Sequence, residues 1–300
     1  MYDIIVIGAG PAGLTAALYA RRANKTVLVL EKGAFGGQIT YSPKVENYPG
    51  FAQLSGNELA DKMVEQVLAQ GADIELETVT GIRDDGDHKT VLTEGGEYPG
   101  RAVIVATGVK HRMLGLPREE QLVGRGISFC AVCDGAFYRG KTVAVIGGGN
   151  SALQEAILLA ENCQKVIVIQ NLDDFTGEPK LVETLTAYPH VECRFGTVVT
   201  DLYGEEELTG IGVASTDGST ERLDIDGLFI AIGLQPDNDA FASLAALDGY
   251  GYFDADETCV TKTPGVFVAG DCRAKAIRQI TTAAADGAIA ALAACKYLDM

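Results

Sequence analysis

Short apolar runs, each ended by a glycine-rich turn, recur along the chain. Residues 3–7 form one such run. A glycine turn and an alanine-rich stretch with helical spacing follow it, and a second apolar run comes at 26–30. The same order returns between residues 142 and 169. Each set is a strand–turn–helix–strand unit, so the pattern predicts a doubly wound α/β fold with two dinucleotide-binding, Rossmann-like domains.

The remaining elements follow from the same periods. Residues 33–50 are rich in glycine, proline and tyrosine and predict a loop. Apolar residues at helical spacing predict helices over 54–70 and, in an alanine-rich segment, over 281–298. The other expected elements are a helix at 153–161 and strands at 102–106, 142–146, 166–169, 228–232 and 266–269.

Composition narrows the classes of partner and location. The 300 residues carry a net charge of −17 at pH 7, which argues against nucleic acid and anionic membranes as partners. No apolar run reaches the ~18 residues of a membrane-spanning helix, and we expect no signal peptide. Seven cysteines, five of them scattered singly, indicate a reducing compartment, so we expect a cytoplasmic protein.

The first glycine turn has the spacing of a dinucleotide site. Gly8, Gly10 and Gly13 fit G-x-G-x-x-G, in which the first glycine allows the turn, the second admits a pyrophosphate and the third lets helix and strand pack closely. Glu31 ends the next strand, where a carboxylate accepts hydrogen bonds from a ribose diol. The alternative is a tight strand–helix turn without a ligand.

The second glycine turn lacks its partner acid. Gly147, Gly149 and Ala152 repeat the spacing, but Gln170 stands where the acid is expected, so the usual ribose contact for NAD is missing. Residues 166–179 hold three acids and no lysine or arginine, which disfavours the 2′-phosphate of NADPH. The turn either cradles a pyrophosphate with little NADPH selectivity or binds no cofactor.

A close cysteine pair is the candidate for redox chemistry. Cys130 and Cys133 form C-x-x-C with Asp134 directly after it. Two cysteines at this spacing can close a small disulfide, and a helix start lowers the pKa of a thiol. Asp134 is placed to give or take a proton. The alternatives are half of a zinc site, which lacks a second ligand pair in the sequence, and two buried structural cysteines. We expect no metal.

Taken together, the order of motifs resembles the low-molecular-weight thioredoxin reductases, a branch of the flavoproteins with two dinucleotide-binding domains. The match covers essentially the whole chain. Its most specific segments are residues 8–13, 36–39, 45–50, 106–108, 130–134, 147–152, 270–271 and 278–280.

This resemblance implies FAD as the cofactor. Gly8, Gly10, Ala12 and Gly13 would take the pyrophosphate and Glu31 the adenosine ribose. Asp271 would contact the ribitol. The other matching residues of the FAD site are Gly37, Gln38, Asn47, Thr107, Gly108, Gly270, Arg278, Gln279 and Ile280.

The resemblance also implies the domain arrangement and the roles of the cysteines. An FAD domain of residues 1–112 and 239–300 would surround an inserted nucleotide-type domain of residues 113–238. Cys133 would face the flavin and Cys130 the protein substrate, a thioredoxin-like protein. Family members are usually homodimers.

One departure concerns the electron donor. Family members that use NADPH carry H-R-R-x-x-x-R after the last strand of the second unit, and residues 170–176 hold none of these arginines. This resembles the branch that does not use NADPH, so we expect ferredoxin as the donor. The alternatives are an NAD(P)H-dependent thioredoxin reductase, a flavin dithiol oxidase and an FAD-binding redox sensor without turnover.

Overall fold

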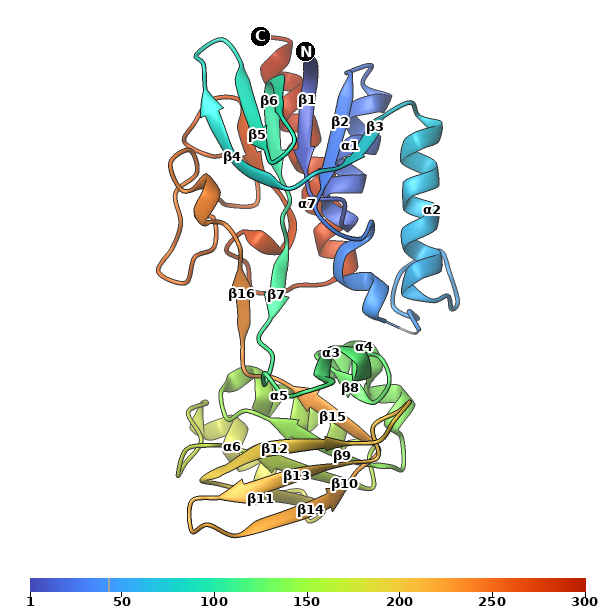
Figure 1. Ribbon diagram of the computed structural model, residues 1–300, viewed down its shortest axis with the longest axis vertical. Helices are drawn as coiled ribbons and strands as arrows, with labels where there is room; N and C mark the ends of the chain where they lie inside the picture. The colour runs from blue at the N-terminus through green and yellow to red at the C-terminus, as the bar shows by residue number, and fades with distance from the viewer. Residues whose placement is uncertain (43) are drawn as a thin grey trace. The chain divides into compact units, whose positions relative to one another are not determined.

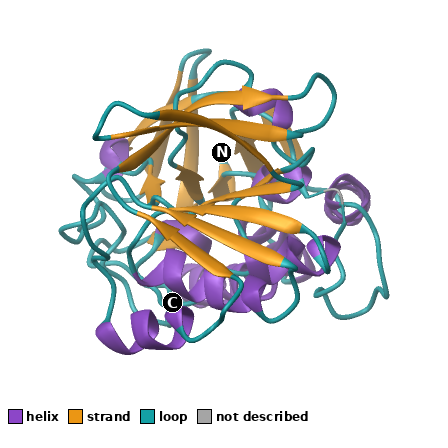
Figure 2. Cartoon of the chain, turned by 90° about the horizontal axis from the view of Figure 1, so that it is seen from below, coloured by secondary structure: helices purple, strands orange, loops and turns teal. Residues whose placement is uncertain are grey.

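The computed structural model describes residues 1–42 and 44–300 and consists of two compact units (Figure 1). One unit is Met1–Lys110 with Gln235–Met300, and the other is His111–Leu234, so the second is an insertion in the first. Both combine helices with strands, which confirms the predicted α/β class (Figure 2). The chain passes between the units within strands β7 (Val109–His111) and β16 (Leu234–Pro236), which pair with each other. For this reason the divisions fall slightly before those expected at residues 112 and 238.

A seven-stranded sheet forms the centre of the first unit, with strand order β3-β2-β1-β6-β5-β4 and β17 paired to β6. The pairs among β1, β2, β3, β6 and β17 are parallel, whereas β4 and β5 are antiparallel additions. The strands are β1 (Tyr2–Ile7), β2 (Val27–Glu31), β3 (Asp73–Leu76), β4 (Val79–Asp84), β5 (Lys89–Thr93), β6 (Glu97–Val105) and β17 (Val266–Val268). The helices are α1 (Pro11–Arg22), α2 (Gly56–Ala69) and α7 (Ile280–Leu298), with 3₁₀ turns η1 (Gly37–Tyr41), η3 (Asp239–Phe241) and η4 (Gly270–Cys272).

The core of this unit explains the continuous apolar strands. Ile4 and Val6 pack in the cluster under α1 and α7, while Ile5 and Ile7 pack in a second cluster on the opposite face. A parallel strand buried on both faces is apolar throughout. Helices α1 and α7 lie side by side, and Gly287 of α7 leaves no room for a Cβ against the α1 backbone. This close packing holds the C-terminal helix against the start of α1, next to the first glycine turn.

The inserted unit holds a parallel sheet in the order β11-β10-β9-β15-β8 and an antiparallel sheet of β12, β13 and β14. Its strands are β8 (Ile127–Ser128), β9 (Thr142–Ile146), β10 (Lys165–Ile169), β11 (Val191–Arg194), β12 (Thr197–Tyr203), β13 (Gly210–Ser215), β14 (Thr220–Asp224) and β15 (Gly227–Ile230). Its helices are α3 (Glu119–Leu122), α4 (Ala131–Asp134), α5 (Asn150–Ala160) and α6 (Pro179–Thr186), with η2 at Gly135–Tyr138.

Several boundaries differ from the sequence prediction. Helix α2 begins at Gly56 and not at residue 54, because Ser55 and Glu58 form a capping box. Helix α5 begins directly after Gly149, three residues before the expected start at 153. Within residues 33–50, predicted as a loop, lies the 3₁₀ turn η1.

Across the described ranges 1–42 and 44–300, we find no helix with the length and apolar character needed to cross a membrane.

Candidate cofactor and redox sites

The first glycine turn is open at one position only. Gly8 has a φ of +105°, and a Cβ on it would overlap the Ala106 carbonyl. A Cβ on Gly13 would overlap the Gly8 carbonyl. A Cβ on Gly10 would meet nothing closer than the Gly36 carbonyl oxygen, at 3.9 Å. The first and third glycines are therefore required by the packing of the turn. The second leaves space at the N-terminus of α1, where a pyrophosphate fits.

Glu31 holds the turn and keeps acceptor capacity. Its Oε2 accepts the Ala9 N–H at 2.7 Å, and its Oε1 accepts the Gly33 N–H at 2.9 Å. Each oxygen of an ionised carboxylate can accept a second hydrogen bond. The side chain is thus fixed at the end of β2 and can still accept from a ribose hydroxyl.

The predicted segment around Gly37 lies against this turn. The Gly36 N–H donates to the Ala9 carbonyl at 2.7 Å. Gly37 has a φ of +60°, and its Cβ would stand 3.4 Å from Gly10 Cα. Two motifs separated along the chain thus border the same open space.

The pair Gly270–Asp271 reaches the start of α1 from the other end of the chain. Gly270 has a φ of +83°, and a Cβ there would lie 2.7 Å from the Ala12 Cβ. Asp271 Oδ1 is fully buried and has no hydrogen-bond partner among the described residues, although Lys275 Nζ stands 4.0 Å away. Burial raises the pKa of Asp271 to about 6. A buried acceptor without a donor is suited to a ligand hydroxyl.

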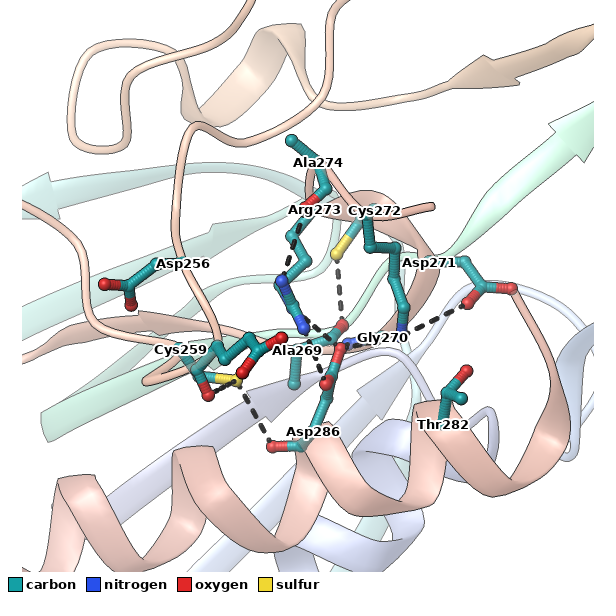
Figure 3. A network of polar contacts seen from close by, with 12 residues as sticks. Asp256, Cys259, Ala269, Gly270, Asp271, Cys272, Arg273, Ala274, Thr282 and Asp286 are labelled. Atoms are coloured by element: carbon teal, nitrogen blue, oxygen red, sulfur yellow. Dashed lines mark hydrogen bonds and ion pairs between the residues drawn. The ribbon is translucent and has the colours of Figure 1, made fainter. Parts of the chain in front are cut away.

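A buried ion-pair network holds this pair in place (Figure 3). Asp286 on α7 accepts the Gly270 N–H at 3.0 Å, Arg273 Nε at 2.8 Å and Lys275 Nζ at 2.9 Å. Burial alone would raise the pKa of Asp286, but the hydrogen bonds from Arg273 and Lys275 hold it below its usual value. Sequence reasoning missed Asp286, although a single acid within an alanine-rich helix was a visible signal.

Residues predicted for the FAD site come together from distant segments. Asn47 Nδ2 donates to Gln279 Oε1 at 3.3 Å. Arg278 Nε donates to the Asp271 carbonyl at 3.3 Å, which ties the segment before α7 to the acid. Ile280, the first residue of α7, packs against the apolar cluster around η1.

Two further predicted residues are fixed by partners that the sequence did not reveal. Gln38 Nε2 donates to the Val109 carbonyl. Thr107 Oγ1 donates to Oδ1 of Asn238 at 3.0 Å, and Asn238 is buried. Gly108 has a φ of +67°.

All predicted cofactor residues lie in the unit Met1–Lys110 with Gln235–Met300. The open space at Gly10 fits a pyrophosphate, the spare acceptors of Glu31 fit a ribose, and the unpartnered oxygen of Asp271 fits a hydroxyl of a bound molecule. These three features together fit FAD.

The cysteine pair is a disulfide in the inserted unit. Cys130 and Cys133 are bonded through their sulfurs, with their Cα atoms 5.3 Å apart, and both are half-buried. The Cys133 N–H donates to Cys130 Sγ at 3.2 Å. Bonded sulfurs are not zinc ligands, and we find no cluster of metal-ligating side chains in residues 1–42 and 44–300. Val132, between the cysteines, is 63% exposed.

Asp134 is held beside the disulfide by Ser128. Its Oδ2 accepts the Ser128 hydroxyl at 2.6 Å, and the same hydroxyl oxygen accepts the Cys130 N–H at 3.1 Å. Burial raises the pKa of Asp134, and its Oδ1 is buried with no partner among the described residues. Such a carboxyl can hold a proton close to the sulfurs. The sequence did not point to Ser128.

The second glycine turn is also open at its middle position. The nearest atom to a Cβ on Gly149 would be Thr176 Oγ1, at 3.8 Å. Gln170 is buried against Gly148, and its Nε2 donates to the Asp174 carbonyl at 3.3 Å. The backbone N–H groups of Thr176 and Gly177 both donate to the Gly148 carbonyl at 2.9 Å. The acidic segment after β10 is thus fastened to the glycine turn.

Comparison with known proteins agrees with these features. The family described as "Pyridine nucleotide-disulphide oxidoreductase" matches residues 2–287. Thioredoxin reductases of Listeria monocytogenes and Bacillus subtilis are 42% and 38% identical, over 100% of this chain and 94% and 95% of theirs. The crystal structure of thioredoxin reductase from Streptococcus pyogenes is 40% identical with a TM-score of 0.94, covering 100% of this chain and 98% of that one. These matches give no support to the predicted ferredoxin-dependent branch. The chain belongs to the pyridine nucleotide-disulphide oxidoreductase family, among its low-molecular-weight thioredoxin reductases.

Proposed function

We propose that this protein is an FAD-dependent reductase of the disulfide of a thioredoxin-like protein. The observation that carries the proposal is the half-buried Cys130–Cys133 disulfide beside the buried carboxyl oxygen of Asp134. The names of its relatives agree with it. The unit Met1–Lys110 with Gln235–Met300 is the FAD domain in this proposal.

Bound FAD supplies the two-electron chemistry that reduces the Cys130–Cys133 disulfide. The Cys130 thiolate then attacks the substrate disulfide, breaking its S–S bond and forming a mixed disulfide; the first substrate sulfur leaves as a thiolate and takes up the proton that Cys130 lost. Cys133 attacks the Cys130 sulfur, which restores the protein disulfide and releases the substrate as a dithiol. Asp134 takes the proton of the Cys133 thiol and gives it to the departing substrate sulfur. Two electrons and two protons pass to the substrate.

A single substitution tests this assignment. Cys130→Ser should retain FAD, because the residues that fit the cofactor lie in the other unit, and should lose all thioredoxin reduction. Cys193→Ser is the matched control, since Cys193 is a half-buried free thiol outside the site, and it should leave turnover unchanged. Thioredoxin reduction by Cys130→Ser would refute the proposed function.

The donor we propose is a pyridine nucleotide, NADH in preference to NADPH. The missing arginines bear on the 2′-phosphate, which NADH does not have, so their absence does not require ferredoxin. The open Gly149 leaves room for a pyrophosphate. The segment after β10 carries the acids Asp173, Asp174 and Glu178. The nearby Arg194 donates hydrogen bonds to the carboxylates of Glu192 and Glu221.

Anaerobic reduction of the holoprotein by each nucleotide tests the donor. We expect kcat/KM with NADH to exceed that with NADPH at least about tenfold, or ~1.4 kcal/mol. Equal or better use of NADPH would contradict our interpretation of residues 170–178. Reduction by a nucleotide without thioredoxin turnover would favour a redox sensor, and rapid oxygen consumption with a small dithiol would favour a dithiol oxidase.

We also propose a homodimer working in a reducing compartment such as the cytoplasm. A groove between α1, α2 and α7 is lined mainly by apolar side chains, among them Leu14, Leu18, Met63 and the 40% exposed Tyr19. The five other cysteines are free thiols. Light scattering of the purified holoprotein should give twice the mass of one chain, and a monomer would contradict the proposed dimer.

A further inference from the structure

A second buried carboxyl flanks the disulfide turn and has no role in the chemistry above. Glu155 lies on α5, which packs against α4. Its carboxyl accepts the backbone N–H of Ala131, the residue directly after Cys130. Its Oε2 is fully buried and has no hydrogen-bond partner among the described residues. Asp134, at the other end of α4, has a similarly unpartnered Oδ1.

We propose that Glu155 is a positioning residue of the redox site, one that keeps a second proton beside Asp134 and thereby sets the pH range in which the dithiol exchanges. This inference rests on the proposed function and deepens it. As a carboxylic acid, Glu155 has a hydroxyl to donate, and the unpartnered Oδ1 of Asp134 is an acceptor. Ionised Glu155 would instead place a negative charge next to the backbone of Cys130.

The surroundings of Glu155 favour its neutral form. Burial raises the pKa of Glu155 to about 8, the hydrogen bond from Ala131 opposes this, and the charge of Asp134 adds to it. Burial raises the pKa of Asp134 as well. When two neighbouring carboxyls are partly buried, ionisation of one raises the pKa of the other, so the two groups titrate as a pair.

Among the groups on elements packed against α5, Asp134 is the one that acts on Glu155. On α6, Lys180 and Glu183 are exposed to solvent. On η2, Tyr138 has its pKa raised to about 12, chiefly by burial, so it stays neutral. On β10, Lys165 is paired with Glu192 at 2.7 Å. Strand β9 and the rest of α5 carry no ionisable side chain.

The pH dependence follows from these charges. An ordinary thiol with a pKa of about 8.5 exchanges faster as the pH rises through that value. Burial raises the pKa of Glu155 to about 8, so its ionisation in this range opposes formation of the neighbouring thiolate and removes the proton that the proposal places beside Asp134. Exchange by Cys130 should therefore flatten or fall near pH 8 where an isolated thiol would continue to rise.

Alkylation of Cys130 across pH 6–10 tests this directly. The dithiothreitol-reduced holoprotein is treated with iodoacetamide, and the Cys130 peptide is followed by mass spectrometry, with thioredoxin turnover measured in parallel. Wild type should show a break near pH 8. Glu155→Gln keeps a carbonyl acceptor for Ala131 but cannot ionise, so it should lose the break and react at least about threefold faster above pH 8. Glu161→Gln removes an exposed carboxylate at the end of the same helix and should behave as wild type.

Each outcome decides the inference. Coincident profiles for wild type and Glu155→Gln would overturn it. If Glu155→Gln fails to fold, the wild-type profile suffices, since a smooth single-thiol titration without a break would overturn it. Glu155→Asp restores an acid and should restore a break. Failure of the proposed function would show separately, as no thioredoxin turnover by wild type with any donor, while the alkylation profile still tests Glu155.

Discussion

Replacing Asp286 with asparagine should both destabilise the first unit and weaken FAD binding. The Asp286 carboxylate lies between two buried cationic side chains, with Arg273 and Asp286 only 8% and 6% exposed at their side chains. It also accepts the Gly270 N–H. An amide offers one acceptor oxygen where the carboxylate offers two, and its NH₂ group would face donors. Arg273 would therefore lose its ion-pair partner, and Lys275 would keep only Asp271, 4.0 Å away.

The magnitude follows from the loss of one partner in a buried ion pair, which costs about 3–5 kcal/mol. The Asp286 pKa lies below its usual value, so the ion pairs contribute fully above the unfolded pKa of about 3.9 and are lost as pH falls through the folded pKa. The difference between Asp286→Asn and wild type should thus be complete at pH 7 and shrink below about pH 4. At pH 7 a loss of ~3 kcal/mol lowers the Tm of a unit of this size by roughly 6–12 °C.

Thermal unfolding at pH 7 and the FAD content after gel filtration measure both effects. Asp61→Asn is the matched control, because it removes one exposed carboxylate from α2 and should change stability by less than about 0.5 kcal/mol. If Asp286→Asn has the same Tm and FAD content as Asp61→Asn, the ion-pair network does not hold the Gly270–Asp271 turn. That result would refute the role given to this turn in the cofactor site.

Two further substitutions separate packing from binding. Gly10→Ala should leave the Tm of the apoprotein within about 1 °C, because its Cβ meets no atom closer than 3.9 Å, yet should weaken FAD binding at least about tenfold by entering the pyrophosphate space; equal FAD affinity by fluorescence titration would contradict this. Placing arginines at the exposed positions Asn171, Leu172 and Thr176 should raise kcat/KM for NADPH at least about tenfold, since a charge-assisted hydrogen bond contributes about 1.5–3 kcal/mol; unchanged NADPH kinetics would show that the nucleotide binds elsewhere.

The sequence was sufficient for the buried central strands of both parallel sheets. Ile4–Ile7 and the corresponding residues of β9 are apolar without interruption because both faces are buried. The short and partly exposed strands escaped prediction. For example, β3 is Asp-Ile-Glu-Leu at a sheet edge, and β12 alternates irregularly because of a bulge between Val199 and Asp201. Such short strands are stabilised by pairing and packing with their neighbours more than by their own local pattern.

The candidate sites show the same division. The glycine spacing and the cysteine pair reflect local backbone requirements, so they were visible in the sequence. Asp286, Asn238 and Ser128 act through hydrogen bonds to residues far along the chain or around a turn, and no spacing rule identifies them. The expectation of ferredoxin finds no support among the relatives, and the physical reason is plain: missing arginines bear only on the 2′-phosphate of NADPH, so they leave NADH open as a donor.

One measurement tests the central claim most directly. The holoprotein is mixed anaerobically with two equivalents of NADH, enough to reduce both the flavin and the Cys130–Cys133 disulfide; its flavin absorbance is followed near ~450 nm, and oxidised thioredoxin is then added. The account predicts that the absorbance bleaches, that it returns when thioredoxin is added, and that about two thioredoxin thiols appear per NADH consumed. Absence of bleaching with both NADH and NADPH, or bleaching that yields no thioredoxin thiols, would contradict it.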